Sequence, residues 1–197
     1  MPRQPGAHNA GRVKNGIKQL LSRLLAARPE MPLSFYALDV VFRRLLRQNA
    51  GVRWAVHHTS TIRSPERLTA GRGSFPGDSP GVYINADNGV SIGDFTNLGP
   101  QVGLISANHD AVDNGVGVAA QPLRVGSFCW LGMRAVVLPG VALGDFTIVG
   151  AGAVVTRSFP EGYCVLAGNP ARILRHLNRE ECDAQARSTY ERHAARK

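Results

Sequence analysis

The sequence has no long apolar run and only three cysteines. Asp145 divides its most apolar region, so no run of about 18 apolar residues remains and we expect no membrane-spanning helix. The N-terminal stretch is polar and lacks the apolar core of a secretory signal peptide. Cys129, Cys164 and Cys182 form no CxxC pair, which gives no zinc or disulfide framework and suits a reducing compartment. We therefore expect a cytoplasmic protein.

Acidic residues are scarce at both ends of the chain, which carries 23 Lys and Arg against 14 Asp and Glu. Residues 1–50 contain nine basic and two acidic side chains, residues 51–171 seven and eight, and residues 172–197 seven and four. The centre is therefore nearly neutral and the flanks are basic. No basic face with interleaved aromatic residues is recognisable, so we expect no nucleic-acid binding. Anionic small molecules and an anionic membrane surface remain open as partners.

A six-residue repeat organises the region from 125 to 160. Every sixth residue is aliphatic, the residue four places later is mostly small, and glycine follows four of the aliphatic residues. Such a repeat is typical of a parallel β-helix, in which three hexads form one triangular coil and glycine tolerates the corner dihedrals. The aliphatic positions are Val125, Leu131, Val137, Leu143, Val149 and Val155, and the small inner positions are Cys129, Ala135, Val141, Thr147, Ala153 and Phe159.

The same phase continues towards the N-terminus, in steps of six from Leu104 to Val56, although Pro80 and Ser74 are poor core residues. It predicts five coils, at residues 56–73, 74–91, 92–109, 125–142 and 143–160. Leu104 and Val125 are 21 residues apart, a distance that six does not divide. We therefore expect an excursion from the coil at about residues 110–122, and we expect Asn108 just before it to point inward.

Two amphipathic helices are expected before the repeat. After a disordered tail at residues 1–13, apolar residues recur at helical spacing over residues 14–28 and 35–46, and Ser34 is the expected N-cap of the second helix. We expect both apolar stripes to pack on the body or on a neighbouring subunit. The alternative is a weak contact of residues 14–47 with a membrane surface.

The chain therefore divides into an N-terminal part at 1–51, a β-helix at 52–166 and a C-terminal part at 167–197. The β-helix should begin with a strand in which His57 and His58 point to opposite faces. In the C-terminal part, residues 167–172 are expected to form a turn that leads into a polar helix. Asn178 and Glu181 resemble a capping box for that helix.

Three segments carry a resemblance to a known family. WLGMRAVVLPGV at 130–141, VGAGAVVT at 149–156 and AGNPAR at 167–172 are similar, in order and spacing, to hexapeptide-repeat acyltransferases of the acetyl-CoA-dependent galactoside, maltose and xenobiotic acetyltransferase branch. The resemblance runs from about Val52 to Arg175. It implies a left-handed parallel β-helix of about five coils with flanking helices. It also implies a homotrimer with active sites between neighbouring prisms, acetyl-CoA as cosubstrate and no metal.

His109 is the candidate catalytic residue. It stands immediately before the expected excursion, and the catalytic histidine of the family falls at this position. Histidine has an unperturbed pKa near 6.5, so it can accept a proton from a hydroxyl or amine and return one to a departing thiolate. Asp110 is adjacent, and it either orients the imidazole or shapes the loop.

Coenzyme and acceptor residues follow from the resemblance only. The pantetheine arm is expected near Met133, Ala151, Thr156 and Arg157, and the phosphates near Arg172 and Arg175. Trp130 is expected to border the acetyl group, with a packed position at the rim as the alternative. A carbohydrate-like acceptor is expected near Asp78, Asn85 and Asp87, for each of which a surface or turn role is the equal alternative. The alternative functions are a non-catalytic trimeric scaffold, a zinc enzyme of the carbonic-anhydrase type and a membrane-associated adaptor.

Overall fold

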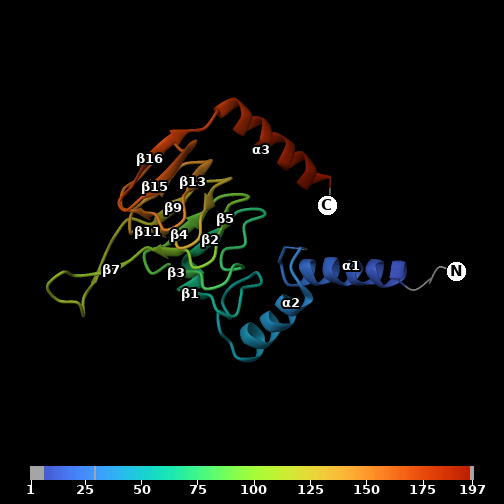
Figure 1. Cartoon of the computed structure of the whole chain (residues 1–197). Coiled ribbons are helices and arrows are strands. Elements are labelled where there is room, and N and C mark those ends of the chain that lie inside the picture. The colour runs from blue at the N-terminus through green and yellow to red at the C-terminus, as the bar shows by residue number, and fades with distance from the viewer. Residues whose placement is uncertain (1–6, 29, 196–197) are drawn as a thin grey trace.

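The computed structural model describes residues 7–28 and 30–195. Its body is a left-handed parallel β-helix, as predicted, and Figure 1 shows α1 and α2 beside the first coils and α3 beside the last. Helix α1 spans Ala7–Leu24, α2 spans Leu33–Asp39 and continues into the π-helical turn η1 (Val40–Leu45), and α3 spans Arg179–Ala194. Within the described ranges no helix is long and apolar enough to cross a membrane.

Three sheets form the faces of the prism, and their strands are parallel except for the last strand of face 3. Face 1 contains β1 (Thr61–Arg63), β3 (Tyr83–Asn85), β6 (Gly103–Ile105), β11 (Val136–Val137) and β14 (Val154–Val155). Face 2 contains β2 (Leu68–Ala70), β4 (Val90–Ile92), β9 (Leu123–Val125) and β12 (Ala142–Leu143), with the short 3₁₀ turn η2 (Pro65–Arg67) before it. Face 3 contains β5 (Asn97–Leu98), β10 (Trp130–Leu131), β13 (Thr147–Val149), β15 (Cys164–Gly168) and β16 (Ala171–His176). The five strands of face 1 confirm the predicted number of coils.

The predicted inward positions are confirmed from residue 125 onward and are partly wrong before it. All six aliphatic positions between Val125 and Val155 are buried. In the earlier coils Ile62 pairs with Ile84, and Ile84 pairs with Leu104. These spacings exceed the 18 residues of three hexads, because the turns at residues 71–82 lengthen the first interval and the turn at residues 86–89 lengthens the second. The predicted boundaries at 56–73, 74–91 and 92–109 are therefore wrong, and Pro80 is exposed.

The glycines of the hexads are required for a different reason from the predicted one. A Cβ on Gly144 would lie 2.2 Å from the carbonyl oxygen of Pro160, and one on Gly126 would lie 2.6 Å from the backbone nitrogen of Asp145. These glycines allow close approach of successive coils. The left-handed backbone conformation occurs instead two residues further on, at Phe128 (φ 56°) and Phe146 (φ 53°).

An aromatic ladder runs along one corner of the prism and holds α3. The rings of Phe95, Phe128, Phe146 and Tyr163 stack with neighbouring centroids 4.9–5.3 Å apart. Tyr190 of α3 packs edge-on against Phe95 and Phe128. The 18-residue interval between Phe128 and Phe146 was a signal for this ladder, because it equals one coil.

The C-terminal segment contains a strand that the sequence did not predict. β16 turns back at Asn169–Pro170 and pairs antiparallel with β15, so residues 167–172 lead into a hairpin and not directly into a helix. The predicted helix cap is confirmed, since the side chain of Asn178 accepts hydrogen bonds from the backbone N–H groups of Glu180 and Glu181.

The N-terminal helices differ from prediction in extent and in orientation. α1 already begins at Ala7, inside the predicted tail, whose residues 1–6 lie outside the described part of the chain. α2 begins at Leu33 after Pro32, so Ser34 is not its N-cap. The predicted apolar stripe of this second helix is mostly exposed, and Asp39 and Arg43 are buried in its place.

Candidate functional site

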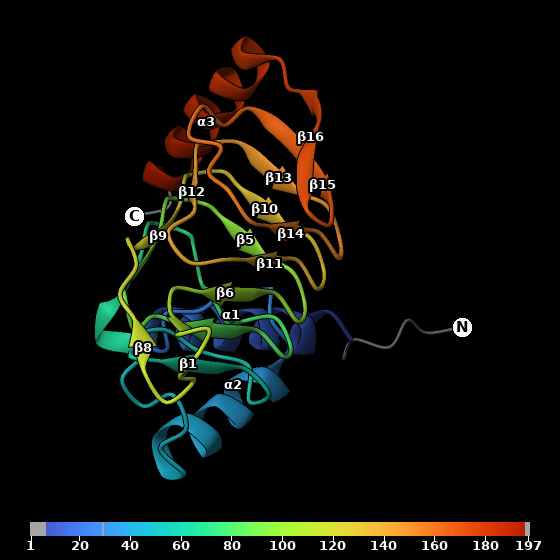
Figure 2. The same cartoon turned by 90° about the vertical axis from the view of Figure 1, so that its left-hand side faces the viewer.

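A β-hairpin carries His109 away from the prism. β7 (Asn108–His109) pairs antiparallel with β8 (Gly117–Val118), and the chain leaves face 1 after β6 and joins face 2 at β9. Figure 2 shows this hairpin in front of the first strands of face 1. The imidazole of His109 is exposed. Asn108 is also exposed, which contradicts its predicted inward position; Ser106 is the buried residue there.

Two polar residues fix the base of the hairpin. The side-chain amide of Asn88 donates to the carbonyl oxygens of Ser106 (3.1 Å) and Val118 (3.2 Å), so it ties both arms of the excursion to the preceding coil. The backbone N–H of Asn88 donates to the hydroxyl of Ser106 at 2.9 Å. His109 is therefore exposed but attached to an anchored segment.

Asp110 shapes the loop. Its carboxylate accepts backbone N–H groups from Val112 (2.8 Å) and Asp113 (3.0 Å). These hydrogen bonds, first that of Asp113, lower the pKa of Asp110. The sequence left open whether Asp110 orients the imidazole of His109 or shapes the loop, and the observed contacts match the second role.

Asn85 and Asp87 lie together at the corner from which the hairpin emerges. The amide of Asn85 donates to Asp87 Oδ2 at 3.0 Å, and Arg63 lies 3.5 Å from the same oxygen. The hydroxyl of Ser64 donates to Asp87 Oδ1, and this bond is the main cause of a lowered pKa of Asp87. The sequence did not predict Ser64 as a partner of Asp87. Ser64 precedes Asp87 by 23 residues, which is more than the length of one regular coil.

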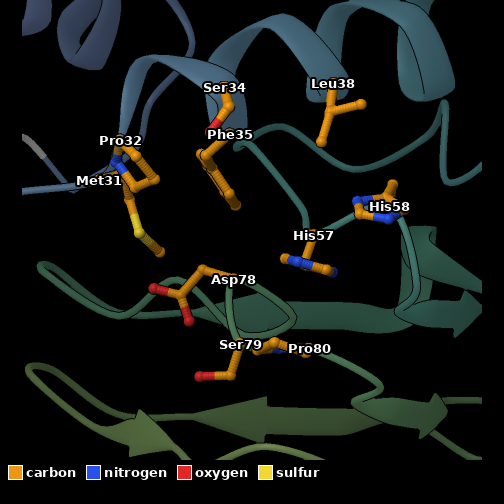
Figure 3. Close-up of a pocket in the computed structure, with 10 residues that line it drawn as sticks. All are labelled: Met31, Pro32, Ser34, Phe35, Leu38, His57, His58, Asp78, Ser79 and Pro80. Atoms are coloured by element: carbon orange, nitrogen blue, oxygen red, sulfur yellow. The ribbon is translucent and has the colours of Figure 1, made fainter.

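Asp78, the third predicted acceptor residue, lies in a separate pocket of about 250 Å³ between α2 and the first coils (Figure 3). Its side chain is only 3% exposed and its Oδ2 lies 2.7 Å from Arg28 Nε, although the N–H does not point at that oxygen. Burial raises the pKa of Asp78 to about 6, and Arg28 partly opposes the shift. The contacts of Asp78 are thus those of a residue that joins the N-terminal segment to the coils.

His57 and His58 line the same pocket, which contradicts their predicted placement on opposite faces of a strand. They lie in an irregular turn before β1, and their rings stack with centroids 4.4 Å apart. Burial, followed by the neighbouring His58, lowers the pKa of His57. Residues 7–28 and 30–195 contain no group of three His, Cys, Asp or Glu arranged to hold a metal ion.

The predicted coenzyme residues are exposed but are spread over three places. Met133 and Ala151 share the corner between faces 3 and 1, where the N–H of Gly152 donates to the carbonyl of Met133 at 2.8 Å. Thr156 and Arg157 follow β14, on the corner from which the His109 hairpin emerges. The third group is on face 3, where Trp130 pairs with Ile148 on the strand surface, and Arg172 and Arg175 lie on β16.

The three arginines of this set make no ion pair with a residue that the structure describes. Arg157 stacks over the ring of Phe159 at 5.0 Å, and Arg172 donates to the carbonyl of its neighbour Ala171. Among the described residues, the ion pairs to Asp side chains are made by Arg28, Arg43, Arg63 and Arg72. Arg157, Arg172 and Arg175 are therefore available to an anionic ligand.

Comparison with known proteins identifies the family. The model of the bacterial transferase hexapeptide (six repeats) family matches residues 122–157. A protein of Escherichia coli K12 assigned as the colanic acid biosynthesis acetyltransferase WcaF is 30% identical over 144 residues, covering 73% of this chain and 78% of its own. The chain belongs to the hexapeptide-repeat acetyltransferases.

Other relatives of this acetyltransferase agree with that assignment. The galactoside O-acetyltransferase of Escherichia coli K12 is 35% identical over 101 residues, which cover 49% of each chain. The solved structure of a galactoside acetyltransferase in complex with coenzyme A superposes with a TM-score of 0.57 over 86% of this chain and 84% of that one, at 22% identity. The structural likeness shows the shared β-helix fold. The protein is thus an acyltransferase enzyme.

Proposed function

We propose that this acyltransferase moves an acetyl group from acetyl-CoA to a hydroxyl, or an amine, of a carbohydrate-like acceptor. The observation that carries the proposal is the exposed imidazole of His109 on an anchored hairpin that interrupts the coils. No described residue makes a hydrogen bond to this ring, so both ring nitrogens are open to a substrate. The resemblance to the family, which carries its catalytic histidine at this position, supports the same role for His109.

His109 would act as general base and then as general acid. Its neutral ring nitrogen takes the proton of the acceptor hydroxyl while the acceptor oxygen attacks the thioester carbonyl. When the tetrahedral adduct collapses, the carbon–sulfur bond breaks and the imidazolium returns the proton to the departing thiolate. Proton transfer of this kind contributes roughly 10²–10⁴-fold to the rate.

Binding of the donor would use the exposed arginines and the glycine- and alanine-rich corners. Guanidinium groups suit phosphate oxygens because they form charge-assisted hydrogen bonds, and Arg172 and Arg175 project from one strand with no ion pair to a described residue. Met133 and Ala151 would border the pantetheine arm, with Trp130 near its acyl end. Thr156 and Arg157 lie on a different corner of this chain, so we assign them to the donor of a neighbouring cleft.

The acceptor would bind beside Asn85 and Asp87, at the corner that also gives rise to the hairpin. Asp87 stays ionised because Ser64 and Asn85 donate to it, so it can accept hydrogen bonds from sugar hydroxyls. The names of the relatives, colanic acid biosynthesis and galactoside acetylation, support a carbohydrate. Asp78 is left out of this site because its carboxylate faces Arg28.

A homotrimer would complete the site. The hairpin extends away from its own coils (Figure 1), so a substrate at His109 needs a second wall that another subunit can provide. Light scattering measures the assembly. A second experiment mixes inactive His109→Ala subunits with inactive Arg172→Ala/Arg175→Ala subunits and tests whether neighbouring subunits share one active site. Activity returns only if one cleft combines residues of two chains.

Release of free thiol from acetyl-CoA tests the function as a whole. The wild-type chain is assayed with a panel of sugars, nucleotide sugars and amines. Acceptor-dependent release supports the proposal and identifies the acceptor class. A chain that neither binds coenzyme A nor releases thiol with any acceptor would contradict the proposal and favour a non-catalytic scaffold.

A further inference from the structure

The helix formed by α2 and η1 has its aliphatic side chains on the outside. Leu45 and Leu46 are 72% and 65% exposed, and Leu38, Val40 and Val41 are 36–41% exposed. The side chains that face the body are Phe35, Tyr36, Asp39 and Arg43. Leu38 borders the pocket beside the coils, whereas the other four aliphatic side chains line no described pocket, and we call them the outer strip (Val40, Val41, Leu45 and Leu46).

The buried ion pair explains why the helix keeps this rotation. Arg43 donates two hydrogen bonds of 2.7 Å to the two carboxylate oxygens of Asp39. Asp39 also accepts the backbone N–H of Val56 at 3.0 Å, and Arg43 donates to the carbonyl of Val52 at 3.1 Å. Turning the aliphatic side inward would break the two bonds that join the pair to Val52 and Val56, and it would carry the pair out to solvent. The exposure of the outer strip is thus built into the fold.

The charge around the outer strip has one sign. Residues 33–52, all described by the structure, contain four charged residues: Asp39, Arg43, Arg44 and Arg47. The first two are buried and neutralise each other, whereas Arg44 and Arg47 are exposed on the outer side. A second copy would place the same cations against each other. An anionic surface is complementary to this arrangement of aliphatic side chains and arginines.

We propose that the outer strip, with Arg44 and Arg47, docks this acetyltransferase onto an anionic membrane surface. A helix with exposed aliphatic residues and flanking cations lies in the interfacial plane, with its apolar side in the headgroup region. The aliphatic side chains leave water and become buried in the headgroup region, and the arginines are attracted by the negative surface potential. The contact is made at the surface, since no described helix can span a bilayer.

Co-sedimentation of the full chain with vesicles tests the proposal. The wild type should sediment with vesicles that contain phosphatidylglycerol, much less with phosphatidylcholine alone, and binding should fall as salt screens the charges. Val41→Ser/Leu45→Ser and Arg44→Gln/Arg47→Gln should each reduce binding roughly tenfold or more. The matched control is Val112→Ser, which changes an aliphatic side chain that is 97% exposed on the hairpin loop.

Three results would overturn the proposal. The first is equal sedimentation with neutral and anionic vesicles. The second is unchanged binding in both double variants. The third is dissociation of the oligomer by Val41→Ser/Leu45→Ser in light scattering, which would show that a second copy covers the outer strip. If the aliphatic variant does not fold, the charge variant and the salt dependence of the wild type still decide.

Discussion

The coils and the N-terminal helix place apolar and charged side chains in opposite ways. In the coils, aliphatic residues such as Leu131 and Val137 are fully buried, and the polar side chains buried with them are mostly uncharged, such as Thr96 and Thr147. In α2 and η1, an Asp–Arg pair is buried and leucines are exposed. Successive coils bury the same repeated positions, whereas the single helix is held by the hydrogen bonds of its Asp–Arg pair to Val52 and Val56. Apolar periodicity therefore indicates the interior in the first region and an outer surface in the second.

The largest effect is expected from breaking the buried pair of the helix. Asp39→Ala leaves the guanidinium of Arg43 buried without its carboxylate, so it should lower the free energy of unfolding by about 3–5 kcal/mol. Urea denaturation followed by circular dichroism measures the loss. The control is Asp39→Leu/Arg43→Met, which removes both charges and should recover much of the stability. A loss under about 1 kcal/mol for Asp39→Ala would mean that the pair does not fix the helix.

The same substitution at two leucines compares the regions directly. Leu131→Ala removes a fully buried side chain from the stacked core and should cost about 2–5 kcal/mol. Leu45→Ala removes a side chain that is 72% exposed and should change stability by less than about 0.5 kcal/mol. Denaturant midpoints of the two variants give the contrast. Equal losses would show that Leu45 is buried in solution, against another copy.

A smaller effect is expected where Arg28 and Asp78 join the two regions. Because burial raises the pKa of Asp78 to about 6 in the folded chain, folding favours the protonated carboxyl. That contribution is present at low pH and is lost as the pH rises through about 6. Wild-type stability relative to Asp78→Asn should therefore fall between about pH 4 and pH 7, by on the order of 2–3 kcal/mol. Unfolding curves at both pH values measure the difference; a difference that does not change with pH would contradict the raised pKa.

Sequence alone predicted the coils best where they are regular. From Val125 to Val155 each coil has 18 residues, so counting in steps of six from one aliphatic residue predicts every inward aliphatic position. In the earlier coils extra residues between Ile62 and Ile84 shift the phase, and six-residue counting cannot detect where the chain bulges. The aromatic ladder carried a visible signal at Phe128 and Phe146 that counting aliphatic residues ignored.

The site could be predicted only as far as its motifs reach. The hairpin position followed from the broken phase after Leu104, and His109 from the family motif beside it. Ser64 and the structural role of Asp78 depend on contacts across coils, with Asp87 and Arg28, which linear spacing does not reveal. The outward rotation of α2 was missed because a stripe pattern shows which residues share a side but not which side packs inward.

The most direct test of the account is the turnover of His109→Ala with the best acceptor, measured together with its affinity for acetyl-CoA. The account predicts a fall in kcat of roughly 10²–10⁴-fold with nearly unchanged affinity, because the imidazole moves protons and does not hold the coenzyme. His193→Ala, which changes a histidine on α3 beside Phe95, should keep normal turnover. Near-normal kcat in His109→Ala would contradict the central claim that this imidazole is the general base.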